Sequence, residues 1–289
     1  MIILSAGLLF LGTSTAWWIG GRLVESANRA IDGVPADLPV QDVTFASKSG
    51  SQIAGWLSTV NDSKGVVVLA HPIRGSRLAV VERAKMFRDT GYSTLMIDLQ
   101  AHGESFGEHI TLGHLERHDV RAAVSYAKAQ LPGQPVIVLG WSLGGAAALI
   151  GSPLEIDALV LESVYPDVHR AVHNRLEMRI GAMRHVAGPA LLMQLRPRLG
   201  VSTDDLRPID FISKAECPVL VLAGTEDQHT TIAESRELFA AAVAPKEMCE
   251  FAGASHENLY RFDAELYRDT VLRFVESSIS SRATETPTN

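Results

Sequence analysis

A serine at the end of an apolar run is the first residue whose position indicates catalysis. The segment Gly140-Trp141-Ser142-Leu143-Gly144 fits the pattern G-x-S-x-G, with an apolar run before it and an alanine-rich stretch after it. Where a strand turns abruptly into a helix, a serine in the turn projects its hydroxyl from the sheet, and the glycines on each side avoid collisions with neighbouring elements. The pattern therefore predicts that Ser142 is a nucleophile.

A serine hydroxyl is a poor nucleophile without a base to take its proton and an acid to orient that base. In chains with this turn the order is serine, then aspartate or glutamate, then histidine. Asp227 and His256 each follow a late apolar run, at the strand edge where open α/β sheets carry ligand chemistry. The sequence predicts a Ser142–His256–Asp227 triad. Glu162 is a rival acid, although the segment directly behind it suits a role in anchoring that segment.

The oxyanion of a tetrahedral intermediate needs backbone N–H donors. We expect one donor from Leu143, which follows the nucleophile at the start of a helix. The other is expected from Ile73, in the loop "HPIRGSR" after an earlier apolar run. Pro72 in that loop has no N–H, but its nitrogen is not the donor required.

Elements of two kinds alternate along the chain and must position these residues. Short apolar runs bounded by turn residues indicate buried strands, and longer stretches with helical periodicity lie between them. We expect a leading hairpin over 40–47 and 52–58, strands over 65–70, 92–98, 135–140, 156–163, 218–224 and 247–253, and helices over 77–91, 115–130, 230–243 and 262–279. This alternation predicts a mostly parallel sheet with helices on both faces.

Residues 164–212 interrupt the alternation, because they contain no clear strand. Apolar residues recur at helical spacing, so we expect amphipathic helices, broken at Gly188-Pro189, that form a lid. Met183 and Leu191 on the apolar stripe are candidates to contact substrate, since flexible Met side chains suit an adaptable pocket. Between residues 164 and 200 there are six arginines and two acids. These arginines either meet anionic groups or are simply solvated.

The N-terminal segment 1–21 has no charged side chain and is long enough to cross a bilayer. We expect it to be a single-pass anchor. A cleaved signal peptide is the alternative, but the segment lacks the basic opening of one. Arg22 and Arg29 follow it and favour a cytoplasmic catalytic domain. Residues 22–38 are expected to be a spacer and residues 281–289 a disordered tail.

Composition excludes some classes of function. The chain of 289 residues has a formal net charge of −7, which argues against a nucleic-acid binder. Its two cysteines, Cys217 and Cys249, have no disulfide or zinc spacing. His114 and Asp119 have an acyltransferase-like H-x-x-x-x-D spacing, which we interpret as chance without further context. No metal or cofactor is expected.

Several motifs in order resemble those of the α/β-hydrolase superfamily over roughly residues 40–280. They are "HPIRG", "DLQAHGES", "GWSLGG", and the pair "GTED" and "GASH". The resemblance extends to membrane-anchored serine-aminopeptidase-like or lysophospholipase-like members, and it implies one hydrolase domain over 39–280. Two departures are Pro72 in place of a usual glycine and Gln100-Ala101 in place of Arg-Gly.

The triad and the resemblance together imply a serine hydrolase that works through an acyl-enzyme. Its expected substrates are small acyl compounds, most of all lipid-like carboxylic esters or thioesters, and its expected partner is a membrane. Two alternatives use the same triad, on peptides or for acyl transfer. An alternative of a different class is a non-catalytic, membrane-tethered interaction module, which would have a broken triad.

Overall fold

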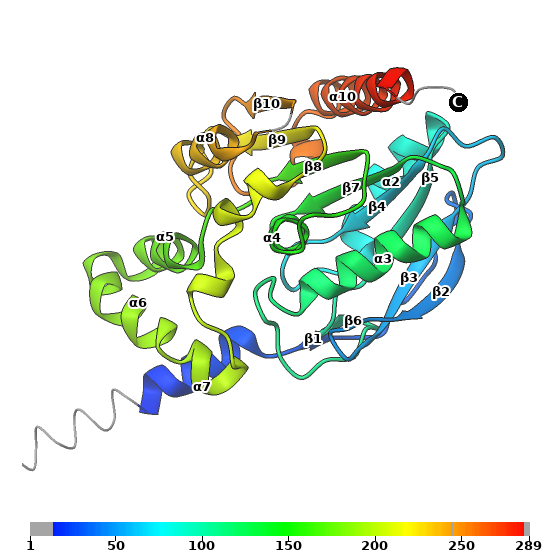
Figure 1. The fold of residues 1–289 in the computed structure, drawn as a ribbon. Coiled ribbons are helices and arrows are strands. Elements are labelled where there is room, and N and C mark those ends of the chain that lie inside the picture. The colour runs from blue at the N-terminus through cyan, green and yellow to red at the C-terminus, as the bar shows by residue number, and fades with distance from the viewer. Residues whose placement is uncertain (1–13, 244, 286–289) are drawn as a thin grey trace, which may run out of the picture.

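An eight-stranded sheet forms the centre of the molecule (Figure 1). The computed structural model describes residues 14–243 and 245–285. The strand order is β10-β9-β8-β7-β4-β5-β3-β2. The strands are β2 (Gln41–Ala46), β3 (Gln52–Ser58), β4 (Val66–Ala70), β5 (Ser93–Ile97), β7 (Val136–Trp141), β8 (Ala158–Glu162), β9 (Val219–Gly224) and β10 (Lys246–Phe251). The pairs β2–β3 and β3–β5 are antiparallel and the others are parallel. The predicted leading hairpin and mostly parallel sheet are confirmed.

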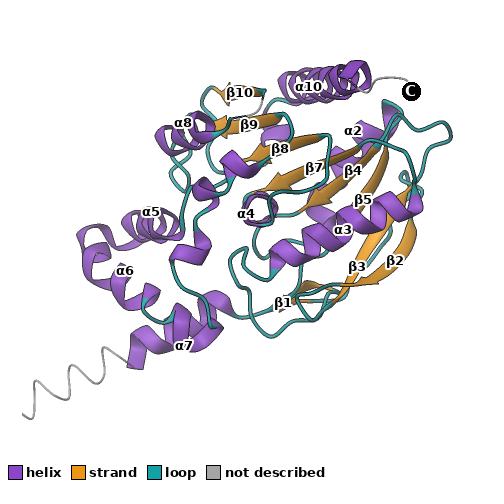
Figure 2. Cartoon of the chain, in the orientation of Figure 1, coloured by secondary structure: helices purple, strands orange, loops and turns teal. Residues whose placement is uncertain are grey.

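Helices cover both faces of this sheet (Figure 2). Successive side chains of a strand point to opposite faces of the sheet, and all five residues of β4 are buried, so both faces must be covered. Val66, Val68 and Ala70 pack in one core cluster with α3 (Glu116–Gln130), α4 (Leu143–Ile150) and α8 (Ile232–Ala241). Val67 and Leu69 pack in the other, with α2 (Val81–Asp89) and α10 (Ala264–Glu285).

Helix α4 lies unusually close to the strands beneath it. A Cβ on Gly144 would lie 2.4 Å from the carbonyl oxygen of Ala70 on β4, and one on Gly140 would lie 2.4 Å from the amide nitrogen of Gly145. Both of these neighbours are backbone atoms that cannot swing away. The glycines of the predicted turn are therefore required by packing between the helix and the sheet.

The insert after β8, here called the lid, lies at one side of the sheet (Figure 1). Its helices are α5 (Val168–Ile180), α6 (Arg184–Leu192) and α7 (Leu195–Leu199), followed by short 3₁₀ turns. The helical insert is as predicted, but the predicted break is wrong. The chain turns at Gly181, where φ is 52°, whereas Gly188 and Pro189 lie inside α6. Glycine adopts positive φ without steric strain, so Gly181 is the residue that permits the turn.

Residues 14–24 form a helix, here called the N-terminal helix, which lies beside α7 (Figure 1). Within the described residues, no helix combines the length and the apolar character needed to cross a membrane. Residues 1–13 of the predicted anchor lie outside the described residues. The segment expected to be a spacer is in contact with the domain: β1 (Ala27–Asn28) pairs with β6 (His102–Gly103), and both Val24 and Leu38 are buried.

The C-terminal helix extends further than the sequence indicates. Helix α10 continues to Glu285, so the prediction of a disordered tail is wrong for residues 281–285. The tail is polar, but a helix already held by buried residues such as Tyr267 and Phe274 can propagate past its last core contact. Residues 286–289 lie outside the described residues.

We predict that Gly144→Ala lowers the free energy of unfolding by about 1–3 kcal/mol or more, because the new methyl group meets the Ala70 carbonyl. Gly188→Ala is the matched control. It also adds a methyl group to a helical glycine, but that methyl group would have Leu176 Cδ1 as its nearest neighbour, at 3.7 Å. Urea unfolding should show it neutral or stabilised. Equal destabilisation of the two variants would contradict the packing argument.

Candidate active site

Ser142 lies at the turn between β7 and α4 in a strained conformation. Its φ is 50° and its ψ is −106°, a region that residues with a side chain seldom adopt, at a cost of roughly 1–3 kcal/mol. Its N–H donates to the carbonyl of Glu162 on the neighbouring strand, at 2.8 Å. The side chain is buried yet lines a cavity. The local structure is thus the strand–turn–helix that the sequence predicts.

Asp227 and His256 lie against each other after β9 and β10. His256 Nδ1 is 2.7 Å from Asp227 Oδ2. The other carboxylate oxygen accepts the backbone N–H groups of His229 and Thr230, at 2.7 and 2.9 Å. The carboxylate is buried and fixed by these three contacts. The His256 Nδ1–H donates to it, which leaves Nε2 as the basic nitrogen.

His229 is a neighbour of this pair that the sequence reasoning missed. Its ring stacks on the ring of His256 with centroids 4.7 Å apart. Burial, and then the neighbouring His256, lower the pKa of His229 below its ordinary value, which keeps the ring neutral near pH 7. A neutral ring can support His256 without adding a repelling charge. Its position two residues after Asp227 was the available signal.

The three predicted residues follow strands β7, β9 and β10, whose carboxyl ends lie at one edge of the parallel sheet. Within the described part of the chain, Ser142 Oγ makes no hydrogen bond to His256. Such catalytic hydrogen bonds often form only when substrate is bound. The structure therefore brings His256 and Asp227 into contact and places Ser142 at the same sheet edge.

The two expected oxyanion donors both border the cavity beside Ser142. Leu143 is the first residue of α4, so its N–H has no acceptor within the helix. The Ile73 loop is held by His71, whose Nε2 accepts the N–H of Leu99 at 3.1 Å while Nδ1 lies 2.7 Å from the Pro72 carbonyl. Burial lowers the pKa of His71 to about 3, so this buried ring is neutral and structural.

Glu162, the rival acid, has other partners. It accepts hydrogen bonds from Arg83 Nε at 2.9 Å and from the Tyr267 hydroxyl at 2.8 Å, and all three side chains are buried. Arg83 comes from α2 and Tyr267 from α10, so Glu162 connects strand β8 to these two helices. The expectation that it anchors the lid is wrong.

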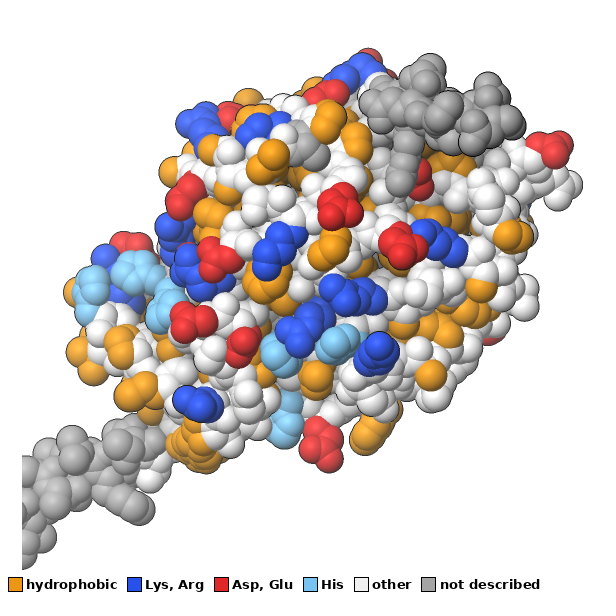
Figure 3. All heavy atoms as spheres, viewed as in Figure 1, with side chains coloured by type: hydrophobic (Ala, Val, Ile, Leu, Met, Phe, Trp, Pro, Cys, Tyr) orange, Lys and Arg blue, Asp and Glu red, His pale blue; other side chains and the backbone are white. Residues whose placement is uncertain are grey.

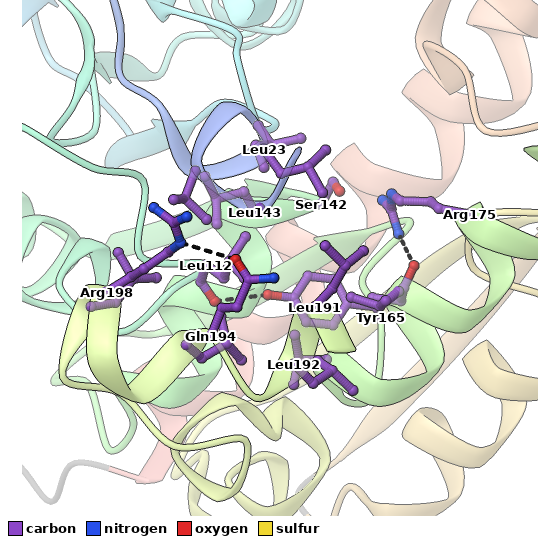
Figure 4. Close-up of a pocket in the computed structure, with 18 residues that line it drawn as sticks. Leu23, Leu112, Ser142, Leu143, Tyr165, Arg175, Leu191, Leu192, Gln194 and Arg198 are labelled. Carbon is purple, nitrogen blue, oxygen red and sulfur yellow. Dashed lines mark hydrogen bonds between the residues drawn. The ribbon is translucent and has the colours of Figure 1, made fainter. Parts of the chain in front are cut away.

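An apolar cavity of about 150 Å³ opens at Ser142 (Figure 4). Of the two lid candidates, Leu191 lines this cavity, whereas Met183 does not and is 69% exposed. The sequence reasoning missed the other walls, because they come from separate parts of the chain. They include Leu112, Tyr165 and Arg175, as well as Gly20, Leu23 and Val24 of the N-terminal helix.

Two other arrangements considered from the sequence are not found at this site. Asp119 accepts hydrogen bonds from Ser47, Ser49 and the Gln100 N–H, whereas His114 contacts Arg117. The two residues of the H-x-x-x-x-D spacing therefore have separate partners. Among the described residues, no group of three or more His, Cys, Asp or Glu side chains is placed to hold a metal ion.

Comparisons with known proteins agree with this fold. Among solved structures, an esterase from Pyrococcus furiosus has a TM-score of 0.73 at 20% identity, covering 88% of this chain and 97% of that one. An esterase from Exiguobacterium antarcticum has a TM-score of 0.59 at 15% identity, covering 82% and 100%. At these identities the likeness shows the α/β-hydrolase fold, and the predicted fold class is confirmed.

Sequence relatives point to the same superfamily. The chain is 23% identical to the protein YqkD of Bacillus subtilis over 80% of its length and 77% of the relative. It is 32% identical to a monoacylglycerol lipase of Mycolicibacterium smegmatis, over 45% of its length and 48% of the relative. Residues 61–207, just over half of the chain, match the family described as serine aminopeptidase, S33. The chain therefore belongs to this family and is a hydrolase of the α/β-hydrolase fold.

Proposed function

We propose that this hydrolase cleaves carboxylic esters with apolar acyl groups, through a Ser142–His256–Asp227 triad. The observation that carries the proposal is the hydrogen bond between His256 and the buried Asp227 carboxylate, at the sheet edge that also holds the strained Ser142. A serine in a sharp strand-to-helix turn, with a base oriented by a carboxylate, is the arrangement that activates a hydroxyl for acyl transfer.

In the proposed reaction, Ser142 Oγ attacks the acyl carbon while its proton passes to His256 Nε2. The Leu143 and Ile73 N–H groups stabilise the oxyanion of the tetrahedral intermediate. His256 then gives the proton to the leaving alcohol, and the bond between the acyl carbon and the leaving oxygen breaks. A water molecule attacks the acyl-enzyme by the same steps in reverse, which releases the acid and restores Ser142.

The lining of the cavity favours esters over peptides with a free amino terminus. An α-ammonium group needs an acceptor, and the described cavity-lining residues include no carboxylate. Their charged members are Arg175 and Arg198, and the rest are mostly aliphatic. An apolar acyl chain fits this lining, as does a lipid-like ester or thioester with a neutral or anionic leaving group. A peptidase or acyltransferase with the same triad is less well supported.

We also propose that the lid side of the molecule meets a membrane, together with the N-terminal segment. Large apolar side chains are exposed there, including Trp17, Trp18, Met183, Val186 and Met193 (Figure 3 shows the lid at the lower left). Residues 178–200 contain four arginines and no acid. Exposed apolar and cationic side chains together suit an anionic lipid surface.

We predict that a fluorophosphonate probe labels the chain and that Ser142→Ala abolishes both the labelling and ester hydrolysis, because the probe needs an activated serine. Labelling measured by mass spectrometry on folded protein tests this. An unlabelled wild-type chain would support the non-catalytic interaction module instead.

We predict that Asp227→Asn lowers kcat by about ten-thousand-fold, because the amide no longer holds His256 in the reactive tautomer. Glu162→Gln is the matched control, another buried carboxylate at the same sheet edge. It should cost about 3–5 kcal/mol of stability by leaving Arg83 poorly paired. Its effect on kcat should be about tenfold or less. The reverse ranking of kcat on folded proteins would assign the acid to Glu162.

We predict that Leu191→Asp impairs hydrolysis of octanoate esters more than that of acetate esters, because a charge enters the apolar wall of the cavity. Met183→Asp, the control, changes a lid residue that is exposed and outside the cavity, so it should leave the ratio of the two rates unchanged. Values of kcat/KM for p-nitrophenyl esters give this ratio. An equal loss for both esters in Leu191→Asp would argue against contact with the acyl chain.

A further inference from the structure

The N-terminal helix contributes side chains to the cavity that opens at Ser142. Gly20, Leu23 and Val24 all line it, and they have the i, i+3, i+4 spacing of one helix face. Figure 4 places Leu23 near Ser142 and Leu143, with Leu191 and Leu192 across the cavity. The N-terminal helix is far from the catalytic motifs in the sequence, yet it borders the same cavity as Ser142.

Lid side chains hold the first part of this helix. Gln194 Nε2 donates to the Ala16 carbonyl at 2.9 Å. The Arg198 guanidinium donates to the Trp17 carbonyl and lies 3.8 Å from the centre of the Trp17 ring. Gly20 allows close contact, because a Cβ there would lie 2.2 Å from Gln194 Oε1. The helix therefore packs closely against α7 and its N-cap residue Gln194.

The loop that carries Ile73 holds the other end of the helix. Arg74 donates from its guanidinium to the carbonyl of Arg22 at 2.6 Å, at the end of the helix where carbonyls lack helical partners. A cation there also complements the negative end of the helix dipole. The last residue of the helix is held as well, because the Ile110 N–H donates to the Val24 carbonyl at 2.8 Å. The N-terminal helix thus connects the lid to the proposed oxyanion loop.

We propose that the N-terminal helix is a wall of the acyl-binding pocket and that Leu23 sets the length of acyl chain the pocket accepts. This inference rests on the proposed ester hydrolysis. The cavity of about 150 Å³ is small beside the roughly 300–1,000 Å³ of common ligand pockets. A longer chain must therefore pass a wall residue. Leu23 is such a residue, because it lines the cavity while half of its surface, 50%, faces solvent.

The experiment uses the full chain and two changes of opposite size at this residue. Leu23→Ala opens the wall towards solvent, so the ratio of kcat/KM for octanoate over acetate esters should rise by about tenfold. Leu23→Trp fills the cavity, so the ratio should fall by a similar factor, about the scale of one methylene group in an apolar pocket. Leu78→Ala is the matched control: this leucine is 41% exposed and does not line the cavity, and the ratio should stay unchanged.

A second readout does not depend on turnover. Calorimetry measures the binding of butyrate, octanoate and decanoate to the Ser142→Ala chain with and without each Leu23 change. Leu23→Ala should favour the longer acids and Leu23→Trp the shorter one. Unchanged length preference in both variants, or no binding of any acid to any variant, overturns the inference. A shifted preference in binding, with no ester hydrolysed by the parent chain, supports the wall and rejects the proposed function.

Discussion

The close contact between helix α4 and strands β4 and β7 is the constraint on which the site depends. The helix can lie there only because Gly140, Gly144 and Gly145 have no side chain, and every residue of α4 is buried as a result. With the helix held so close, the chain has one residue in which to reverse direction. That residue is Ser142, which is forced to a positive φ. The packing around Ser142 holds it in this strained conformation, as expected where the surrounding structure enforces a sparsely populated backbone conformation.

A buried cation links this turn to the base. Arg83 pairs with Glu162, whose carbonyl accepts the Ser142 N–H. The same guanidinium lies 4.7 Å from the centre of the Trp141 ring, next to the nucleophile, and donates to Asn258 Oδ1 at 3.0 Å, two residues after His256. Burying the Arg83 charge without partners would be energetically unfavourable, so Glu162 and Asn258 are held close to its guanidinium. One side chain thus fixes the spacing between the turn and the loop that carries the base.

The sequence was sufficient to predict the strands of the eight-stranded sheet, the turn at Ser142 and the contact of Asp227 with His256, because each rests on local patterns and on the order of strand ends. The short pair β1–β6 was not predicted, since β1 lies in the segment expected to be a spacer. Contacts between distant segments were not predictable. Nothing near Glu162 indicates that Arg83, 79 residues earlier, is its partner. The break in the lid was misplaced because Gly188 and Pro189 resemble a helix end, whereas both lie inside α6 and Gly181 makes the turn. Pro189 has no N–H to donate within the helix, and α6 continues past it all the same. The stacking of His229 on His256 depends on how the loops after β9 and β10 pack together, which no local pattern indicates.

The N-terminal helix shows why hydropathy alone is ambiguous here. The segment 1–21 has no charged side chain and two tryptophans, a composition that suits a lipid environment and an apolar pocket equally well. The pocket and the surroundings of the protein contact different faces of the helix over residues 14–24. Gly20, Leu23 and Val24 line the cavity, whereas Trp18 is 67% exposed. Because Arg198 holds one end of this helix and Arg74 the other, a displacement of the helix would change the cavity wall and the loop of Ile73 together.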